Sequence, residues 1–184
     1  YPTHNYEKYR IFVGNGVNKL CTRALPEDKK DETNTLLELF TSYYEENYLL
    51  KTSAYDGITD VLEKLSQSGF ILAVATNKPQ YCAEKIISKL FAEINFHKIL
   101  GGCAEREKKP SPQIIRDILC DFDDEINAFM FGDSNVDIMT AKNAEIKSIG
   151  CTWGFRDENE LIEANADFIA HKPSDILDFI LQSK

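Results

Sequence analysis

The sequence predicts an α/β protein with a doubly wound parallel sheet, preceded by a helical unit. Three observations predict this fold class. Residues 10–50 show only the helical spacing of apolar positions, without a strand pattern between them. From residue 52 onward, short apolar runs alternate with helical patterns, as in consecutive βαβ units. The run Phe70–Ala75 contains no polar residue, which is typical of a strand buried on both faces of a sheet.

The N-terminal part reads as helical because apolar and aromatic side chains recur three and four residues apart between Leu36 and Tyr44. The character of the sequence changes near residue 52. We therefore expect a helical unit over residues 1–52 and an α/β domain over residues 53–184.

In the α/β domain, a helix is expected over Gly57–Gln67, because Ser68-Gly69 is a stop signal, and Phe70–Ala75 follows as a strand. A second helix is expected at once, with Pro79 in its first turn. The remaining elements are expected in this order: a strand at Lys98–Leu100, a helix begun by Ser111 and Pro112, a strand at Ile126–Phe131, a helix through Ala144, a strand at Lys147–Cys151, a helix near Glu158–Ala164, a strand at Phe168–Ile169 and a helix from Pro173. In such sheets, ligands bind at the carboxyl ends of the strands.

Composition excludes several classes of partner. The chain has 21 Lys and Arg against 30 Asp and Glu, a net charge of −9, so it would repel a nucleic-acid backbone. Its longest apolar stretch is far shorter than the roughly 18 residues of a membrane span. The five cysteines are widely spaced, without a CxxC pair, which argues against a zinc site or a disulfide framework and indicates the reducing cytoplasm.

Polar residues follow the predicted strand Phe70–Ala75. Thr76, Asn77 and Lys78-Pro79 bring a hydroxyl, an amide and backbone N–H groups to the start of a helix, which is a natural position for an anion. Thr and Asn are also ordinary helix caps, so the segment alone is a weak signal.

Two carboxylates flank a tight turn after Phe131. Asp133 and Asp137 are four residues apart, and oxygen ligands of this kind can hold a hard cation such as Mg²⁺. The alternative is structural: Asp133 or Ser134 caps the helix and Asp137 is a solvated acid of its first turn.

Lys109 lies between these two segments, just before Pro110. The proline biases the lysine toward an extended backbone, and a lysine held there can neutralise a phosphoryl oxygen. A lysine pair on a loop is most often plain surface.

Taken together, the strings TNKP, KPSP and FGDSNVD closely resemble the haloacid dehalogenase superfamily of phosphatases, over essentially the whole chain. VGNG at Val13–Gly16 and TWGFR at Thr152–Arg156 look most like its phosphoglycolate phosphatases. The resemblance implies that residues 1–52 are a small helical cap on a core formed by residues 53–184. We expect the protein to be a monomer or a homodimer.

One part of the family pattern is absent. The family's nucleophile lies on its first core strand in an Asp-x-Asp-Gly-Thr motif, and the only Asp-x-Asp here is Asp121-Phe122-Asp123, in an acidic loop. We therefore expect that the first core strand, its loop and the first cap helix, about thirty residues, are missing before Tyr1. A pseudoenzyme without the nucleophile is the alternative.

The resemblance implies a Mg²⁺-dependent phosphomonoester hydrolase that acts on a small phosphorylated metabolite such as 2-phosphoglycolate through an aspartyl phosphate. Asp133 would bind the metal directly and Asp137 would bind it or its water. Thr76 and Asn77 would hold phosphoryl oxygens, and Lys109 would offset their charge.

The cap would recognise the leaving group, with Gly14, Asn15 and Gly16 as its best candidate contact or, alternatively, as a plain helix start. The alternative functions are a pyrophosphatase, a β-phosphoglucomutase and a non-catalytic module that binds a phosphorylated ligand.

Overall fold

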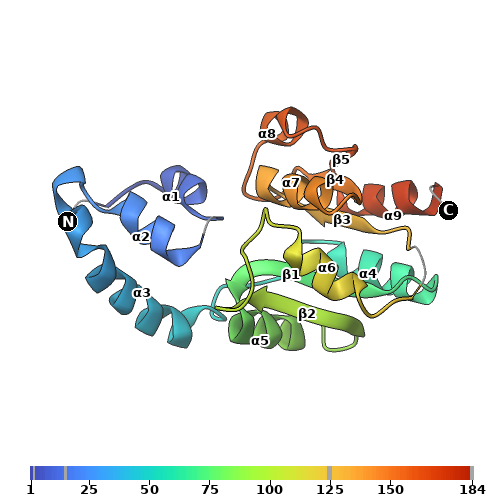
Figure 1. Ribbon diagram of the computed structural model, residues 1–184, viewed down its shortest axis with the longest axis horizontal. Coiled ribbons are helices and arrows are strands. Elements are labelled where there is room, and N and C mark those ends of the chain that lie inside the picture. Colours follow the sequence, from blue (N-terminus) through green and yellow to red (C-terminus); the bar gives the residue numbers. More distant parts are fainter. Residues whose placement is uncertain (2, 15, 124–125, 183–184) are drawn as a thin grey trace. The chain divides into compact units, whose positions relative to one another are not determined.

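The computed structural model describes residues 1, 3–14, 16–123 and 126–182, which divide into two compact units, Tyr1–Thr52 and Ser53–Lys184 (Figure 1). The first unit contains the helices α1 (Tyr6–Phe12), α2 (Val17–Ala24) and α3 (Thr33–Asn47) and the 3-10 helix η1 (Glu27–Glu32). As predicted, its described residues contain no strand.

The interior of the first unit is small. Cys21, Leu25 and Tyr48 are its buried apolar residues. On α3 the ring of Tyr44 stacks on those of Phe40 and Tyr48, each with centroids 5.4 Å apart. These rings are four residues apart along the helix, which is the spacing that brings side chains onto one face.

The second unit alternates helices and strands, as the sequence predicts. Its elements are α4 (Ile58–Gln67), β1 (Leu72–Pro79), α5 (Gln80–Leu90), β2 (Phe96–Gly102), α6 (Gln113–Leu119), β3 (Phe129–Gly132), α7 (Asn135–Asn143), β4 (Lys147–Cys151), α8 (Glu158–Glu163), β5 (Phe168–Ala170) and α9 (Pro173–Gln182).

All strand pairs in this unit are parallel. β1 pairs with β2, with Ala75 opposite Leu100. β4 lies between β3 and β5, with Ile149 opposite both Phe131 and Phe168. The described strands thus form a two-stranded and a three-stranded sheet, whereas the sequence predicts a single sheet from which one strand is missing.

The end of β1 differs from the prediction. Pro79 was expected in the first turn of a helix, but Thr76–Pro79 belong to the strand, and α5 begins only at Gln80. Gly101 and Gly102 explain the difference: a Cβ on Gly101 would lie 2.6 Å from the Gln80 Cα, and one on Gly102 would lie 3.0 Å from the Asn77 oxygen. Only glycines let β2 lie so close to this segment.

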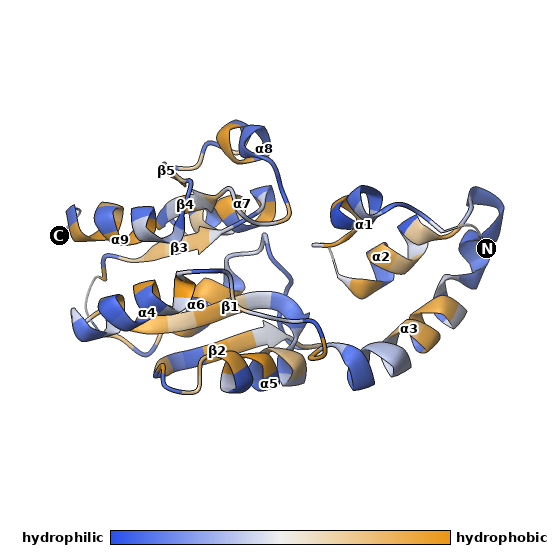
Figure 2. Cartoon of the chain, turned by 180° about the vertical axis from the view of Figure 1, so that it is seen from behind, coloured by the Kyte–Doolittle hydropathy of each residue, from blue (hydrophilic) through white to orange (hydrophobic). Residues whose placement is uncertain are grey.

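The core of the second unit is aliphatic and aromatic, in agreement with the buried strands that the sequence predicts (Figure 2). Leu65, Ile149 and Ile176 are at most 1% exposed. A second cluster contains Ile114 and Met130. Within the described part of the chain, no helix is both long and apolar enough to cross a membrane.

Candidate active site

The predicted site residues of the second unit come from the end of β1 and from the connections that follow β2 and β3. Thr76 and Asn77 lie at the end of β1, and Lys109 lies in the loop between β2 and α6. Asp133 directly follows β3, and Asp137 lies in the first turn of α7. Hydrogen bonds join three of the five residues, Asn77, Lys109 and Asp137.

Lys109 connects β1 to the first turn of α7. Its Nζ lies 2.6 Å from Asp137 Oδ1 and donates a hydrogen bond of 2.9 Å to the carbonyl oxygen of Ala75, the last residue of β1 before Thr76. The side chains of Lys109 and Asp137 are only 9% and 11% exposed. Lys108, in contrast, is exposed. The buried ammonium therefore lies at the carboxyl ends of both β1 and β3, where positive charge can act on an anion with little screening by water.

Asn77 fixes the backbone of Lys109. Its Oδ1 accepts a hydrogen bond of 2.8 Å from the Lys109 N–H, and its Nδ2 donates one of 3.1 Å to the Lys109 carbonyl oxygen. The family resemblance implies for Asn77 only a contact with phosphoryl oxygens. The side chain has a positioning role that sequence reasoning missed, because an amide side chain is both donor and acceptor but its partner is 32 residues away.

Thr76 shapes the same turn. Its Oγ1 accepts a hydrogen bond of 3.1 Å from the Lys78 N–H, so its own O–H is a donor that can turn toward a ligand.

The two carboxylates have different surroundings. Both oxygens of Asp137 have partners, Oδ1 in Lys109 and Oδ2 in the Ser134 hydroxyl at 2.6 Å. Asp133 Oδ2 accepts a hydrogen bond of 2.8 Å from the Phe155 N–H. For Asp133 Oδ1, no partner is found among the described residues. Ser134 is the N-cap residue of α7, as the structural alternative expects, but its side chain makes no cap hydrogen bond and donates to Asp137 instead.

Two glycines make room for these carboxylates. A Cβ on Gly132 would lie 2.4 Å from the Asp137 Cβ, and one on Gly154 would lie 2.1 Å from the Asp133 Cβ. The loop 152–156 therefore supplies both the space and a hydrogen bond for Asp133. The string TWGFR was noticed in the sequence only as a resemblance, and the contacts of Gly154 and Phe155 with Asp133 were not foreseen.

Glu160 is a further residue that sequence reasoning missed. Its Oε1 accepts a hydrogen bond of 3.1 Å from the Asn135 N–H at the start of α7 and lies 3.5 Å from the Arg156 Nε. It thus ties the loop after β4 to the loop after β3.

The carboxylates also affect a buried thiol. Burial, with a smaller effect of the nearby Asp133 and Asp137 charges, raises the pKa of Cys151 to about 12. A thiol with such a pKa is protonated at neutral pH, so Cys151 is a packing residue and not a nucleophile.

The donor set fits a magnesium ion. Mg²⁺ prefers oxygen ligands and is commonly bound by one or two carboxylates together with waters and phosphate oxygens. Asp133 offers a carboxylate oxygen at the end of a strand, with Asp137 one helical turn further on. Within the described ranges, no group of three or more His, Cys, Asp or Glu residues gathers as a closed all-protein metal site.

The predicted cap contact belongs to the first unit. Gly14 has φ 116° and follows α1, and Gly16 has φ 89° and precedes α2. Asn15 lies outside the described residues. Both glycines adopt a backbone that other residues rarely take. Their contact with a substrate stays a prediction.

Comparison with known proteins gives the family. A model described as haloacid dehalogenase-like hydrolase matches residues 1–151. A phosphoglycolate phosphatase of Vibrio parahaemolyticus is 32% identical over 191 residues, which cover 100% of this chain and 84% of the relative. One from Aquifex aeolicus is 33% identical and covers 96% of this chain and 79% of its own length.

Solved structures agree. A haloacid dehalogenase-like hydrolase of Streptococcus pneumoniae superimposes with a TM-score of 0.81 at 27% identity, covering 97% of this chain and 83% of that protein. The chain therefore belongs to the haloacid dehalogenase-like hydrolase family, and it has the fold of that family, as its motifs indicate.

Proposed function

We propose that the second unit carries the phosphate- and metal-binding part of a Mg²⁺-dependent phosphomonoesterase that acts on a small phosphorylated acid, 2-phosphoglycolate being the first candidate. The observation that carries the proposal is the buried Lys109 ammonium, held at the ends of β1 and β3 beside Asp137 and next to the Asp133 loop. The names of the relatives from Vibrio parahaemolyticus and Aquifex aeolicus support the choice of substrate.

In this proposal the residues of the chain bind and orient the phosphoryl group. The Thr76 hydroxyl and the Asn77 N–H donate hydrogen bonds to its oxygens, and the Lys109 ammonium offsets negative charge as it develops. Asp133 and Asp137 would hold the metal. Bound Mg²⁺ would neutralise part of the phosphate charge, so that an anionic nucleophile can approach.

The nucleophile is not supplied by the residues described here. Asp121-Phe122-Asp123 lies ahead of β3, at the opposite end of that strand from Asp133, and Asp121 pairs with Lys98 at 2.6 Å. We therefore propose that the 184-residue chain does not hydrolyse phosphomonoesters by itself. We also propose that residues 1–52 act as a cap that recognises the leaving group, with Gly14–Gly16 as the contact. The proposed location of the protein is the cytoplasm.

A substrate panel tests the proposal. The protein as its gene encodes it should release phosphate from 2-phosphoglycolate with Mg²⁺ and with a higher kcat/KM than from β-glucose 1-phosphate or pyrophosphate. A preference for pyrophosphate, or isomerisation of the sugar phosphate without release of phosphate, would point instead to one of the two related activities. Binding of the phosphorylated compounds without turnover would favour a non-catalytic module.

A further inference from the structure

The loop that carries Lys109 is fastened by an arginine that lies shortly before the lysine in the sequence. Arg106 Nε donates a hydrogen bond of 2.8 Å to Asp117 Oδ2 in α6. Its Nη1 donates one of 2.7 Å to the carbonyl oxygen of Gly101 at the end of β2. The Arg106 side chain is only 17% exposed. One guanidinium thus links the loop to a strand and to a helix at once.

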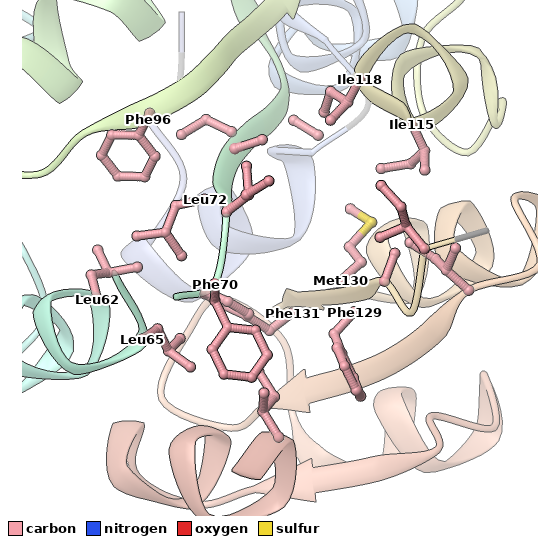
Figure 3. A pocket seen from close by; sticks show the side chains of 18 of the residues that line it. Leu62, Leu65, Phe70, Leu72, Phe96, Ile115, Ile118, Phe129, Met130 and Phe131 are labelled. Atoms are coloured by element: carbon pink, nitrogen blue, oxygen red, sulfur yellow. The ribbon is translucent and has the colours of Figure 1, made fainter. Parts of the chain in front are cut away.

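The helical partner of Arg106 is itself held in place. The other oxygen of Asp117, Oδ1, accepts a hydrogen bond of 2.6 Å from Gln113 Nε2. The hydrogen bond from Arg106 holds the pKa of Asp117 below its ordinary value, so the carboxylate is ionised at neutral pH. Ile115 and Ile118 of the same helix are buried and line the apolar slot between β1 and β3 (Figure 3). Asp117 therefore lies on a helix that the core anchors.

The end of β2 connects Arg106 with the other residue that fixes the loop. Gly101 accepts the hydrogen bond from Arg106, and the neighbouring Gly102 lies so close to Asn77 that a Cβ on it would be 3.0 Å from the Asn77 oxygen. The Asn77 side chain in turn bonds the backbone N–H and the carbonyl oxygen of Lys109. Arg106 and Asn77 therefore hold the short segment that ends in Lys109 against the same strand end.

The chain beyond Lys109 is tied separately. Asn143 Nδ2 donates a hydrogen bond of 2.8 Å to the carbonyl oxygen of Pro110. The lysine is thus fastened on both sides in the sequence. Such fastening matters for catalysis, because a misplacement of about 1 Å can lower a rate about a hundredfold. A guanidinium suits this task, since its planar, fixed donors reach a carboxylate and a carbonyl oxygen together, whereas an ammonium is a single point charge on a flexible chain.

We propose that Arg106, paired with Asp117, is a positioning residue that holds the loop so that the Lys109 ammonium stays between Ala75 and Asp137. The inference rests on the proposed function, in which Lys109 acts on the phosphoryl group. Arg106 acts through Lys109. Because Lys109 offsets charge that develops in the transition state, loss of Arg106 should lower kcat more than it raises KM.

Steady-state kinetics of the gene-encoded protein with 2-phosphoglycolate test the proposal. Arg106→Ala should lower kcat at least tenfold and change KM less than threefold. Arg116→Ala, which removes an exposed arginine of α6, is the matched control and should stay near wild type. In a Lys109→Ala background, Arg106→Ala should lower kcat no further. A wild-type kcat in Arg106→Ala, or an equal loss in both backgrounds, would overturn the proposal, because Arg106 would not act through Lys109.

Amide hydrogen exchange of the same proteins, measured without substrate, gives an independent readout. Arg106→Ala should speed exchange of the Lys109 N–H at least tenfold and leave the amides of β4 unchanged. Arg116→Ala should change neither. Unchanged exchange at Lys109 would overturn the proposal, and so would faster exchange throughout the unit, which would indicate general destabilisation. If the wild-type protein hydrolyses no phosphate ester, the proposed function fails, whereas the exchange at Lys109 still decides whether Arg106 positions the loop.

Discussion

At the scale of single residues, the proposed site requires that Lys109, and not Lys108, reaches the phosphate. Lys109→Ala removes a preorganised charge from a site with little water, which should cost about 3 kcal/mol, or roughly a hundredfold in rate. Lys108→Ala is the matched control, since Lys108 is exposed and should stay near wild type. Steady-state kinetics of the gene-encoded protein, with circular dichroism to verify folding, provide the measurement. Equal small losses for both variants would contradict the assignment of Lys109.

Replacement by asparagine should change the metal dependence more at Asp133 than at Asp137. Asp133 Oδ1 is available to a metal, whereas both oxygens of Asp137 contact protein donors. We expect Asp133→Asn to raise the Mg²⁺ concentration needed for half-maximal activity at least tenfold above wild type, because the metal loses a direct anionic ligand. Asp137→Asn should raise this concentration less. Titration of activity with Mg²⁺ measures both. An unchanged metal dependence in Asp133→Asn would refute its role as a ligand.

At the scale of elements, a carboxylate ties β5 to β4. Asp167 Oδ2 accepts hydrogen bonds from the Oγ and N–H of the buried Ser148, at 2.6 and 2.8 Å. These bonds hold the pKa of Asp167 below its ordinary value, chiefly through the Ser148 hydroxyl. A lowered folded-state pKa stabilises the fold above the unfolded pKa of about 3.9, and this stabilisation disappears as the pH falls through the folded-state value.

Asp167→Asn should therefore lower the free energy of unfolding at pH 7 by about 1 kcal/mol, a modest figure because the carboxylate is exposed. The difference from wild type should shrink toward zero near pH 2. Urea unfolding at both pH values measures it, with Asp178→Asn, an exposed aspartate of α9, as the control. A difference that persists at low pH would show that geometry, and not the charge, links the two strands.

The sequence predicts the elements well where periodicity and composition act locally. The strand at Lys147–Cys151 has the predicted bounds, and the helix that precedes β1 ends at Gln67 as expected. The extension of β1 to Pro79 could not be predicted, because it depends on Gly101 and Gly102 of another strand. The strand predicted at Ile126–Phe131 begins only at Phe129 in the structure, because an apolar run does not show at which of its residues the strand begins.

In the candidate site, too, local sequence patterns indicate some features, whereas contacts between distant segments leave no such pattern. Residue types, their positions after strands and the family resemblance together indicated Lys109 and Asp133 as candidates, and their roles stay predictions. The partners that orient them are distant in the sequence: Asn77 contacts Lys109 from 32 residues away, and Phe155 contacts Asp133 from 22 residues away. Such contacts depend on how the loops meet and leave no local pattern to read.

At the scale of the whole molecule, the chain combines a helical unit with an α/β unit that contains two parallel sheets and an apolar slot between them. The central claim is that the α/β unit binds and orients a phosphoryl group but does not supply the nucleophile. Two forms of the protein separate these functions: residues 1–184 alone, and the same chain with a segment carrying an Asp-x-Asp motif placed ahead of residue 1.

Release of inorganic phosphate from 2-phosphoglycolate, measured with and without Mg²⁺, tests this claim most directly. We predict no release above background by residues 1–184 alone and Mg²⁺-dependent release by the extended form. Mg²⁺-dependent turnover by residues 1–184 would contradict the claim that the nucleophile lies outside them, and a folded extended form without turnover would contradict the phosphatase assignment.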